Sequence, residues 1–175
     1  FVFREELRAE AASAVAALRQ AGVECRVLTG DHAGRGRIIE ASLHIPVESE
    51  LLPTGKVGAV QQISRSCGPT AMAGDGVNDA PALAEASVGI AMGSGTDVTR
   101  ESADVVLIGN DLSRFVDTLR TARRVQRTIR QNFVGTIAID VLGMGLAAFG
   151  LLGPLLAAAI HVTQELAFIA NSALL

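Results

Sequence analysis

The sequence predicts an α/β domain with a parallel sheet, followed by a long helix and a hairpin of two membrane-spanning helices. In the first part, short apolar runs alternate with helical stretches, and this alternation favours right-handed βαβ units with parallel strands. Beyond it, charge almost vanishes: all 15 Lys and Arg precede Asn132, and only Asp140 and Glu165 are charged after it. The predicted parts are residues 1–112, 113–131 and 132–175.

The helices of the first part are predicted from apolar spacing and from the residues that end them. Residues 5–21 carry one apolar stripe at helical spacing. Asp31 is a candidate cap for a second helix that runs to about residue 43, and residues 54–66 form a third. The proline-bearing segment between the second and third helices is predicted to be a loop. Natural helix ends are Gly22 and the pair Gly68-Pro69.

The strands are predicted from short apolar runs bounded by turn residues. These runs are residues 23–28, 70–73, 88–92 and 104–108. In a parallel, Rossmann-like sheet, ligands collect outside the carboxyl ends of the strands. Residues 29–31 and 74–79 each follow a strand directly, so we expect these two loops to meet at one edge of the sheet.

The run Gly-Asp-Gly-Val-Asn-Asp-Ala-Pro-Ala-Leu at residues 74–83 is the most informative segment. It places Asp75 and Asp79 on a turn that leaves a strand, where carboxylates suit Mg²⁺. Gly74 and Gly76 flank Asp75 and would let the backbone approach a phosphate closely. The two carboxylates could instead simply cap the loop, but that role would not require glycine at both positions 74 and 76. The run therefore predicts a metal and phosphate site.

Two further residues fit a phosphate site. Thr29 ends a predicted strand before a glycine, so its hydroxyl and the nearby amides could hold a phosphoryl oxygen, although Thr-Gly-Asp alone is a weak signal. Lys56 is the single lysine among 15 basic residues. An exposed lysine is the default interpretation, but an ammonium is a compact charge for a phosphate.

A long helix is predicted from a cap at Asp111 or Ser113 through Arg130. It carries a cluster of arginines at positions 120, 123, 124, 127 and 130. A solvated helix face is one interpretation of this cluster. The apolar segments that follow favour another, since arginines next to a membrane span mark the cytoplasmic side.

The two arms of the predicted hairpin are residues 133–152 and 155–175, separated by Gly153-Pro154. Each has about 20 residues, the length that crosses the hydrocarbon core. A buried soluble hairpin would carry a charged outer face, and these arms carry none. The prediction is a multi-pass protein of the plasma or inner membrane, with the first part in the cytoplasm and the lipid bilayer around the arms.

Composition argues against other partners and compartments. Net charge is −3 and Trp and Tyr are absent, so no nucleic-acid partner is expected. Cys25 lies in an apolar run, which favours a buried thiol in a reducing compartment. The chain opens on Phe1 without an initiator Met. We therefore expect it to begin inside a longer polypeptide.

The order Thr29, Lys56, Asp75, Asp79 resembles the last three motifs of the haloacid-dehalogenase superfamily. The residues in and around these motifs are similar to those of the P-type ATPases in particular, and the similarity extends over nearly the whole chain. The runs that carry this resemblance are Thr-Gly-Asp at 29–31, Leu-Leu-Pro-Thr-Gly-Lys at 51–56, the run at 74–83, Val-Gly-Ile-Ala-Met-Gly-Ser-Gly-Thr-Asp-Val at 88–98 and Ala-Asp-Val-Val-Leu at 103–107.

The resemblance implies a role for each site residue. Asp75 would ligate Mg²⁺, and Asp79 with Asn78 would complete the metal shell and fix the phosphorylated loop. Thr29 and Lys56 would bind the oxygens of an aspartyl phosphate, which is charge stabilisation during phosphoryl transfer. The loop after the first strand would be shaped by Gly30 and Asp31.

The sequence also departs from the family pattern. Thr54-Gly55 replaces an acidic pair, His32 stands where Asn is common, and residues 4–10 form a loose version of a run with a domain-hinge role. The phosphorylated aspartate belongs to an Asp-Lys-Thr-Gly-Thr motif that this sequence lacks. We expect this aspartate upstream, in a missing N-terminal part that also provides most of the contacts to ATP. We therefore expect the present chain alone to be inactive.

The second arm points to the transported ion. His161 and Glu165 are four residues apart and share a helix face, and an imidazole with a carboxylate suits Zn²⁺, Co²⁺ or Mn²⁺. Asp140 is a candidate third ligand or an interfacial residue near the cytoplasmic side, while a helix–helix hydrogen bond is the alternative for His161. The resemblance implies the heavy-metal-transporting branch. Rival functions are a membrane-anchored phosphatase of the same superfamily and a non-catalytic regulatory relic.

Overall fold

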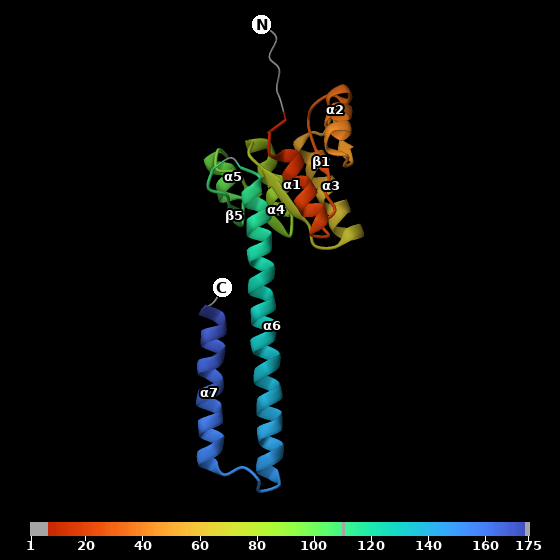
Figure 1. The fold of residues 1–175 in the computed structure, drawn as a ribbon. Coiled ribbons are helices and arrows are strands. Elements are labelled where there is room, and N and C mark those ends of the chain that lie inside the picture. The colour runs from red at the N-terminus through yellow and green to blue at the C-terminus, as the bar shows by residue number, and fades with distance from the viewer. Residues whose placement is uncertain (1–6, 110, 174–175) are drawn as a thin grey trace. The chain divides into compact units, whose positions relative to one another are not determined.

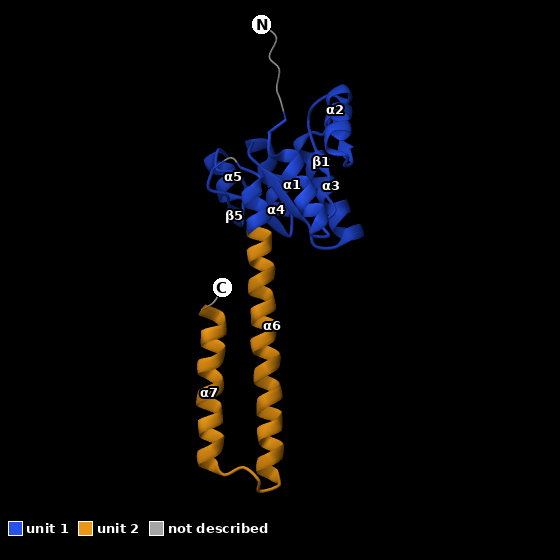
Figure 2. Cartoon of the chain, in the orientation of Figure 1, with its two compact units in different colours: residues 1–117 blue, residues 118–175 orange. Residues whose placement is uncertain are grey.

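The computed structural model of the protein describes residues 7–109 and 111–173. It divides into two compact units, residues 1–117 and 118–175 (Figure 2). The first unit contains every described strand, and the second is a helical hairpin. The division into three parts, with a separate helix over residues 113–131, stays a prediction.

Two parallel sheets form in the first unit. Strands β1 (Val27–Leu28) and β2 (Val47–Glu48) pair in one, with Val27 opposite Val47. The other has the order β3-β4-β5. All these pairings are parallel, which confirms the predicted α/β class. The strands of the second sheet are β3 (Ala71–Gly74), β4 (Val88–Ala91) and β5 (Val105–Val106).

Strand β2 lies in the segment that was predicted to be a loop, so that prediction was wrong. Its two residues form a strand only because they pair with β1, a partner that local sequence does not reveal. The same pairing limits β1 to its two residues, although residues 23–28 were predicted as the strand.

Helices separate the strands along the chain (Figure 1). The predicted second and third helices are confirmed by α2 and α3, while α1 is shorter than the predicted 5–21, of which residues 5 and 6 lie outside the described part. His32 rather than Asp31 caps α2, since its Nδ1 accepts a hydrogen bond from the Arg35 amide at 3.2 Å. The helices are α1 (Ala11–Gln20), α2 (Ala33–Leu43), α3 (Pro53–Cys67), the 3₁₀ turn η1 (Val77–Asp79), α4 (Ala80–Glu85) and α5 (Asp97–Glu101).

One apolar cluster joins the elements that carry the predicted site. Val60 of α3, Met72 of β3 and Leu83 of α4 are buried together, and Leu28 of β1 packs against them. The strands β1 and β3 therefore share a core although they are hydrogen-bonded into different sheets. The loops that follow β1 and β3 are therefore attached to one common core.

The cysteines lie outside this cluster. Both are free thiols, Cys25 half-buried and Cys67 exposed. Burial raises the pKa of the Cys25 thiol, with a smaller opposing effect from Arg19. Cys25 was predicted to be a buried thiol and is only half-buried, and its reducing compartment stays a prediction.

The long helix α6 (Ser113–Ala148) runs without interruption for 36 residues. Asp111 begins it, since its carboxylate accepts hydrogen bonds from the Ser113 amide at 2.8 Å and the Ser113 hydroxyl at 2.6 Å. The same two hydrogen bonds lower the pKa of Asp111. The first arm ends at Ala148 instead of residue 152, and Gly150 follows with a φ of 71°.

Helix α7 (Pro154–Ala173) returns alongside α6 in the second unit (Figure 1). Asn132 donates hydrogen bonds to the Ser172 hydroxyl at 2.9 Å and the Phe168 carbonyl at 3.3 Å, and Asn171 donates to the Asn132 oxygen at 2.7 Å. A Cβ added to Gly135 would lie 2.8 Å from the Phe168 ring, so glycine lets the ring approach α6. Polar bonds and a small residue therefore join the helices, as in membrane helix pairs.

The outer face of the hairpin is mostly apolar, with Asp140, His161 and Glu165 as exposed ionisable side chains. In the described part of the chain, α6 is the one helix long and apolar enough to cross a membrane, and none of its apolar window is buried. A core helix of a soluble protein would instead be covered by its neighbours. A second crossing by α7, which His161, Gln164 and Glu165 make more polar, stays a prediction.

Candidate active site

Asp75 and Asp79 take up different positions after β3. Asp79 folds back toward the strand, where a Cβ added to Gly74 would lie 2.8 Å from the Asp79 Cβ. The Gly76 amide donates a hydrogen bond to Asp79 Oδ2 at 3.4 Å. Neither glycine has a positive φ. Gly74 is thus required by the packing of Asp79, a reason different from the close approach to phosphate that the sequence suggested.

Lys56 and Asp79 form an ion pair at the centre of this site. The Lys56 Nζ lies 2.6 Å from Asp79 Oδ1, and each side chain is only 14% exposed. Lys56 is held in the first turns of α3, a helix whose start is favoured by Pro53 at its first position. Two of the predicted site residues, 23 positions apart, are therefore in direct contact.

Asp75 points outward and pairs with an arginine that was not predicted as a site residue. Arg8 Nη2 lies 3.0 Å from Asp75 Oδ2, with 35% and 51% of the two side chains exposed. The contact joins residues 67 positions apart, so local sequence carried no signal for it. Arg8 belongs to the run with the expected hinge role, of which residues 4–6 lie outside the described part.

Thr29 and its neighbours form a tight turn after β1. The Thr29 hydroxyl accepts a hydrogen bond from the Asp31 amide at 3.1 Å, and Asp31 pairs with Arg35 at 2.9 Å. The Thr29 carbonyl accepts a bond from the Leu51 amide at 3.0 Å, which ties the turn to the segment before α3. A Cβ added to Gly30 would lie 3.3 Å from the Leu51 carbonyl. Thr29 is therefore connected to the segment before Lys56 by a backbone hydrogen bond rather than by a direct contact with the lysine.

The donor set near β3 fits a Mg²⁺ ion that keeps part of its water. Asp75 presents an exposed carboxylate and Asn78 is exposed on η1, whereas both oxygens of Asp79 already accept hydrogen bonds. Among the described residues, no group of three or more His, Cys, Asp or Glu is placed to hold a metal. One or two carboxylates with phosphate oxygens and water are the usual Mg²⁺ environment, and an all-protein cage is not.

The hairpin holds a second polar pair. His161 Nε2 lies 3.4 Å from Glu165 Oε1, and both side chains are more than half exposed. Asp140 is exposed on α6, and the described residues do not gather it with this pair into a three-ligand group. Gln164, between the pair in sequence, is only 6% exposed, and its Oε1 has no hydrogen-bond partner. No local pattern in the sequence signals that buried amide.

Comparison with known proteins gives matches over both units. Residues 1–87 match the family of haloacid dehalogenase-like hydrolases. A manganese-exporting P-type ATPase of Mycobacterium leprae (strain TN) is 42% identical over 172 residues, which is 97% of this chain and 24% of that protein. The probable cation-transporting ATPase G of Mycobacterium tuberculosis (strain ATCC 25618 / H37Rv) is 46% identical over 170 residues, 96% of this chain and 22% of the relative. The chain thus spans about a quarter of the length of these relatives.

A solved structure matches the fold closely. The crystal structure of a zinc-transporting PIB-type ATPase in its E2.Pi state superposes with a TM-score of 0.91 and 37% sequence identity. The match covers 97% of this chain and 28% of that one. A second crystal structure of a zinc-transporting PIB-type ATPase, in another state, gives a TM-score of 0.87 at 38% identity and covers 95% of this chain and 27% of that one.

Proposed function

The chain belongs to the heavy-metal-transporting P-type ATPases, whose phosphorylation domain is haloacid dehalogenase-like, and we propose that it supplies the phosphate and Mg²⁺ side of their phosphorylation site. The observation that carries the proposal is the ion pair between Lys56 and Asp79 beside the exposed carboxylate of Asp75. The site thus combines an ammonium with an exposed carboxylate that pairs with Arg8, and phosphoryl transfer to an aspartate needs both charges.

Each residue of the site has a proposed task. The Lys56 ammonium neutralises charge on the phosphoryl oxygens, and Asp79 holds it in place before the phosphate arrives. The Thr29 hydroxyl and the Gly30 amide donate hydrogen bonds to the same oxygens, while the Asp31 amide, which donates to the Thr29 hydroxyl oxygen, shapes the turn. Positioning of this kind is the main protein contribution to phosphoryl transfer.

Mg²⁺ would be held by Asp75, with Asn78 beside it. Bound there, the ion would offset the negative charge that builds up on the transferred phosphoryl group. Asp79 would reach the ion through water, since its oxygens are engaged by Lys56 and Gly76. Arg8 would have to leave Asp75 to make room, because both cations would otherwise compete for one carboxylate.

The nucleophilic aspartate and most of the ATP-binding surface are proposed to come from other parts of the complete polypeptide. The relatives are about four times as long as the matched segment, which leaves room for these parts. In the complete protein, ATP would phosphorylate that aspartate, and the present segment would stabilise the phosphoenzyme and then help to hydrolyse it.

The cargo is proposed to be a divalent transition-metal cation. The matched relatives carry the names manganese-exporting and zinc-transporting ATPase. The His161–Glu165 pair offers nitrogen and oxygen ligands of the kind such ions accept. The cytoplasmic side is proposed for the end of α6 that carries the arginines, because basic residues next to a span favour that side, and the hairpin is proposed to lie in the plasma or inner membrane.

The proposal is tested by the variant Asp75→Asn in the complete transporter. We expect it to abolish the Mg²⁺-dependent phosphoenzyme formed from labelled ATP, because an amide is a much weaker Mg²⁺ ligand than a carboxylate. Asp97→Asn is the matched control, since Asp97 is 95% exposed and pairs only distantly with Arg100. A normal phosphoenzyme level in Asp75→Asn would refute the metal role.

A further inference from the structure

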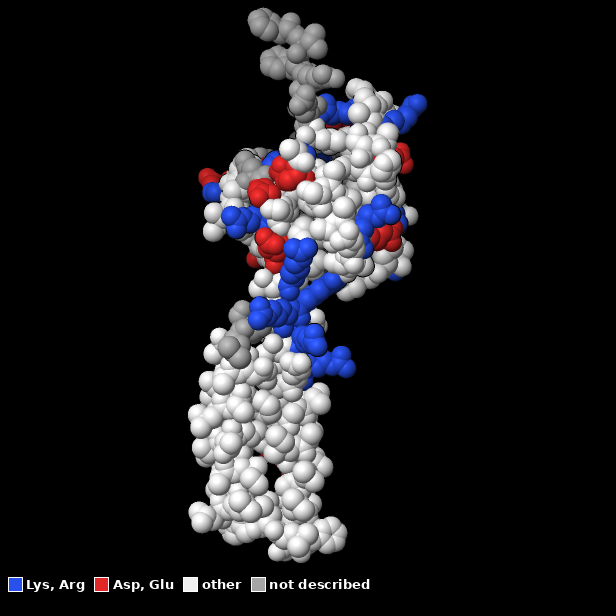
Figure 3. All heavy atoms as spheres, in the orientation of Figure 1, with Lys and Arg blue, Asp and Glu red and all other residues white. Residues whose placement is uncertain are grey.

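Glu50, between β2 and α3, has a backbone conformation that is strained for a residue with a Cβ atom. Among the described residues other than glycine, only His44 and Glu50 have a positive φ, of 52° and 61°. Acidic and basic side chains are spread over the face of the first unit that Figure 3 shows, so charge alone does not distinguish Glu50. Its backbone does, because such strain persists only where surrounding contacts fix it, and it is common next to functional sites.

The backbone at Glu50 is bonded to the turn that follows β1. The Thr29 amide continues the ladder between β1 and β2 by donating to the Glu48 carbonyl at 2.9 Å. A regular parallel ladder would then bring residue 50 to the Thr29 carbonyl, but the Leu51 amide donates there instead, at 3.0 Å. The Glu50 amide donates to the Asp31 carbonyl at 2.8 Å. The chain therefore holds one extra residue at this point, as in a β-bulge, and the left-handed backbone of Glu50 accommodates it.

The side chain of Glu50 holds the same turn through a second contact. Its Oε1 accepts a hydrogen bond at 3.3 Å from the amide of Ala33, the first residue of α2. The first amides of a helix have no partner within the helix and carry partial positive charge, so a carboxylate is favourable there. Glu50 is thus bonded to the turn at Asp31 by its amide and to the helix that begins two residues later by its carboxylate.

The chain leads from Glu50 directly into the helix that carries Lys56. Helix α3 begins at Pro53, and the Lys56 amide donates to the Leu52 carbonyl at 3.0 Å. The turn at Thr29 is bonded to the segment that precedes this helix, through the amides of residues 50 and 51. The conformation of Glu50 therefore sets where the start of α3 lies relative to the turn.

We propose that Glu50 is a positioning residue for phosphate binding. It holds the turn at residues 29–31 and the start of α3 in the arrangement in which Thr29 and Lys56 bind the same phosphoryl group. The bond from its carboxylate to α2 offsets the strain of its left-handed backbone. Glu50 itself does not touch the phosphate, because its own negative charge would repel that group. The inference rests on the proposed phosphate site of Thr29 and Lys56.

The test is back-phosphorylation of the complete transporter by labelled inorganic phosphate in the presence of Mg²⁺. Glu50→Ala loses the bond to the Ala33 amide and keeps the backbone amide that bonds to Asp31. If the turn then spends less time in the binding arrangement, the apparent affinity falls by the same factor. Because losing a helix cap shifts such an equilibrium about fivefold, the half-saturating phosphate concentration should rise about fivefold at an unchanged maximum level. Glu50→Gln keeps an oxygen that accepts the bond and should recover most of the affinity.

His44→Ala is the matched control, because His44 has the other positive φ and lies at the opposite end of α2. It should leave the half-saturating concentration unchanged. A lower maximum level at an unchanged half-saturating concentration, or a Glu50→Ala protein that does not fold, would show that Glu50 only stabilises the fold. Wild-type affinity in Glu50→Ala, or an equal loss in Glu50→Ala and Glu50→Gln, would also overturn the positioning role. If inorganic phosphate did not phosphorylate even the wild type, the proposed function itself would fail, and the inference with it.

Discussion

The ammonium of Lys56 and a carboxylate oxygen of Asp79 lie 2.6 Å apart, with 14% of each side chain exposed. The pair joins α3 to the turn after β3, and so it connects the two halves of the predicted phosphate site. Removing one partner of such a pair leaves a charge that has lost both water and its counter-ion. The site is therefore also a structural element of the first unit.

Replacing Lys56 by Met should destabilise the first unit by about 3 kcal/mol, because Asp79 is left without its counter-ion. The double variant Lys56→Met/Asp79→Asn should recover part of this loss, since the unpaired charge is then gone. Amide hydrogen exchange in α3 and α4, followed by mass spectrometry in detergent, measures the effect.

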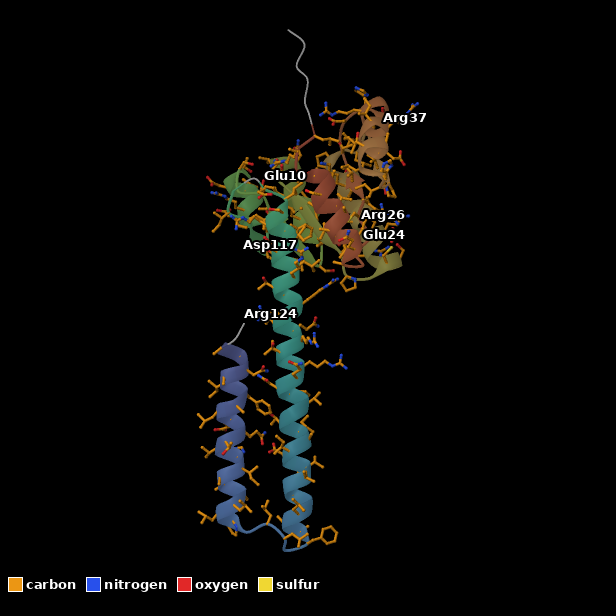
Figure 4. All side chains as sticks on the ribbon, viewed as in Figure 1. Glu10, Glu24, Arg26, Arg37, Asp117 and Arg124 are labelled. Atoms are coloured by element: carbon orange, nitrogen blue, oxygen red, sulfur yellow. The ribbon has the colours of Figure 1, made fainter. Side chains whose placement is uncertain are left out.

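The control for this prediction is an ion pair on the surface of the same unit. Glu24 and Arg26 are 2.8 Å apart, with 61% and 34% of their side chains exposed (Figure 4). Glu24→Gln should leave hydrogen exchange unchanged, because water replaces the lost partner. If Lys56→Met also left hydrogen exchange unchanged, the pair of Lys56 and Asp79 would not stabilise the first unit.

Removing Arg8 should strengthen Mg²⁺ binding. The Arg8 guanidinium pairs with the Asp75 carboxylate that would bind Mg²⁺. A half-exposed ion pair of this kind contributes less than about 1 kcal/mol, so Arg8→Gln should raise the affinity for Mg²⁺ by up to about fivefold. Titration calorimetry with Mg²⁺ on the full chain in detergent gives the affinity. Arg100→Gln is the matched control on the same unit, and Asp75→Asn should abolish the binding. An unchanged affinity in Arg8→Gln would show that Arg8 and Mg²⁺ do not share the carboxylate.

The sequence was sufficient wherever the signal was local. Gly68 marks the end of α3, and the run after β3 predicts a turn with two carboxylates. Each of these signals lies within a few residues of the feature that it predicts. The contact between Lys56 and Asp79 was not predicted, because the rule that loops after parallel strands share an edge was applied to residues 29–31 and 74–79, whereas Lys56 lies in a helix.

What the sequence missed depends on contacts between distant segments. Strand β2 exists only through its pairing with β1, and Arg8 reaches Asp75 across 67 positions. The role of Gly74 was misjudged for a related reason. The glycine makes room for the Asp79 side chain, and that fold-back is visible only in three dimensions.

The hairpin offers a test in which the same substitution is made at two glycines of α6. Gly135→Ala should weaken the contact with α7 by about 1 kcal/mol, because the new methyl group would lie 2.8 Å from the Phe168 ring and force it to shift. Gly145→Ala meets no atom within 4 Å and should be neutral or slightly stabilising. Hydrogen exchange of α7 in detergent compares the two. Equal exchange in both variants would mean that the ring does not pack on Gly135.

The pair of His161 and Glu165 should matter for transport and not for the chemistry of the phosphate. In the complete transporter, changing both to Ala should lower metal-stimulated ATP hydrolysis at least about tenfold, since ionisable residues inside a membrane are costly and are retained for function. Back-phosphorylation by inorganic phosphate should persist, because it uses Thr29, Lys56 and Asp75 instead. Thr163→Ala is the control: its hydroxyl bonds only to the Ala159 carbonyl of its own helix, at 2.8 Å. Metal activation that survives the double change would remove the pair from the ion path, and its 3.4 Å contact would then serve only to satisfy two polar groups on α7.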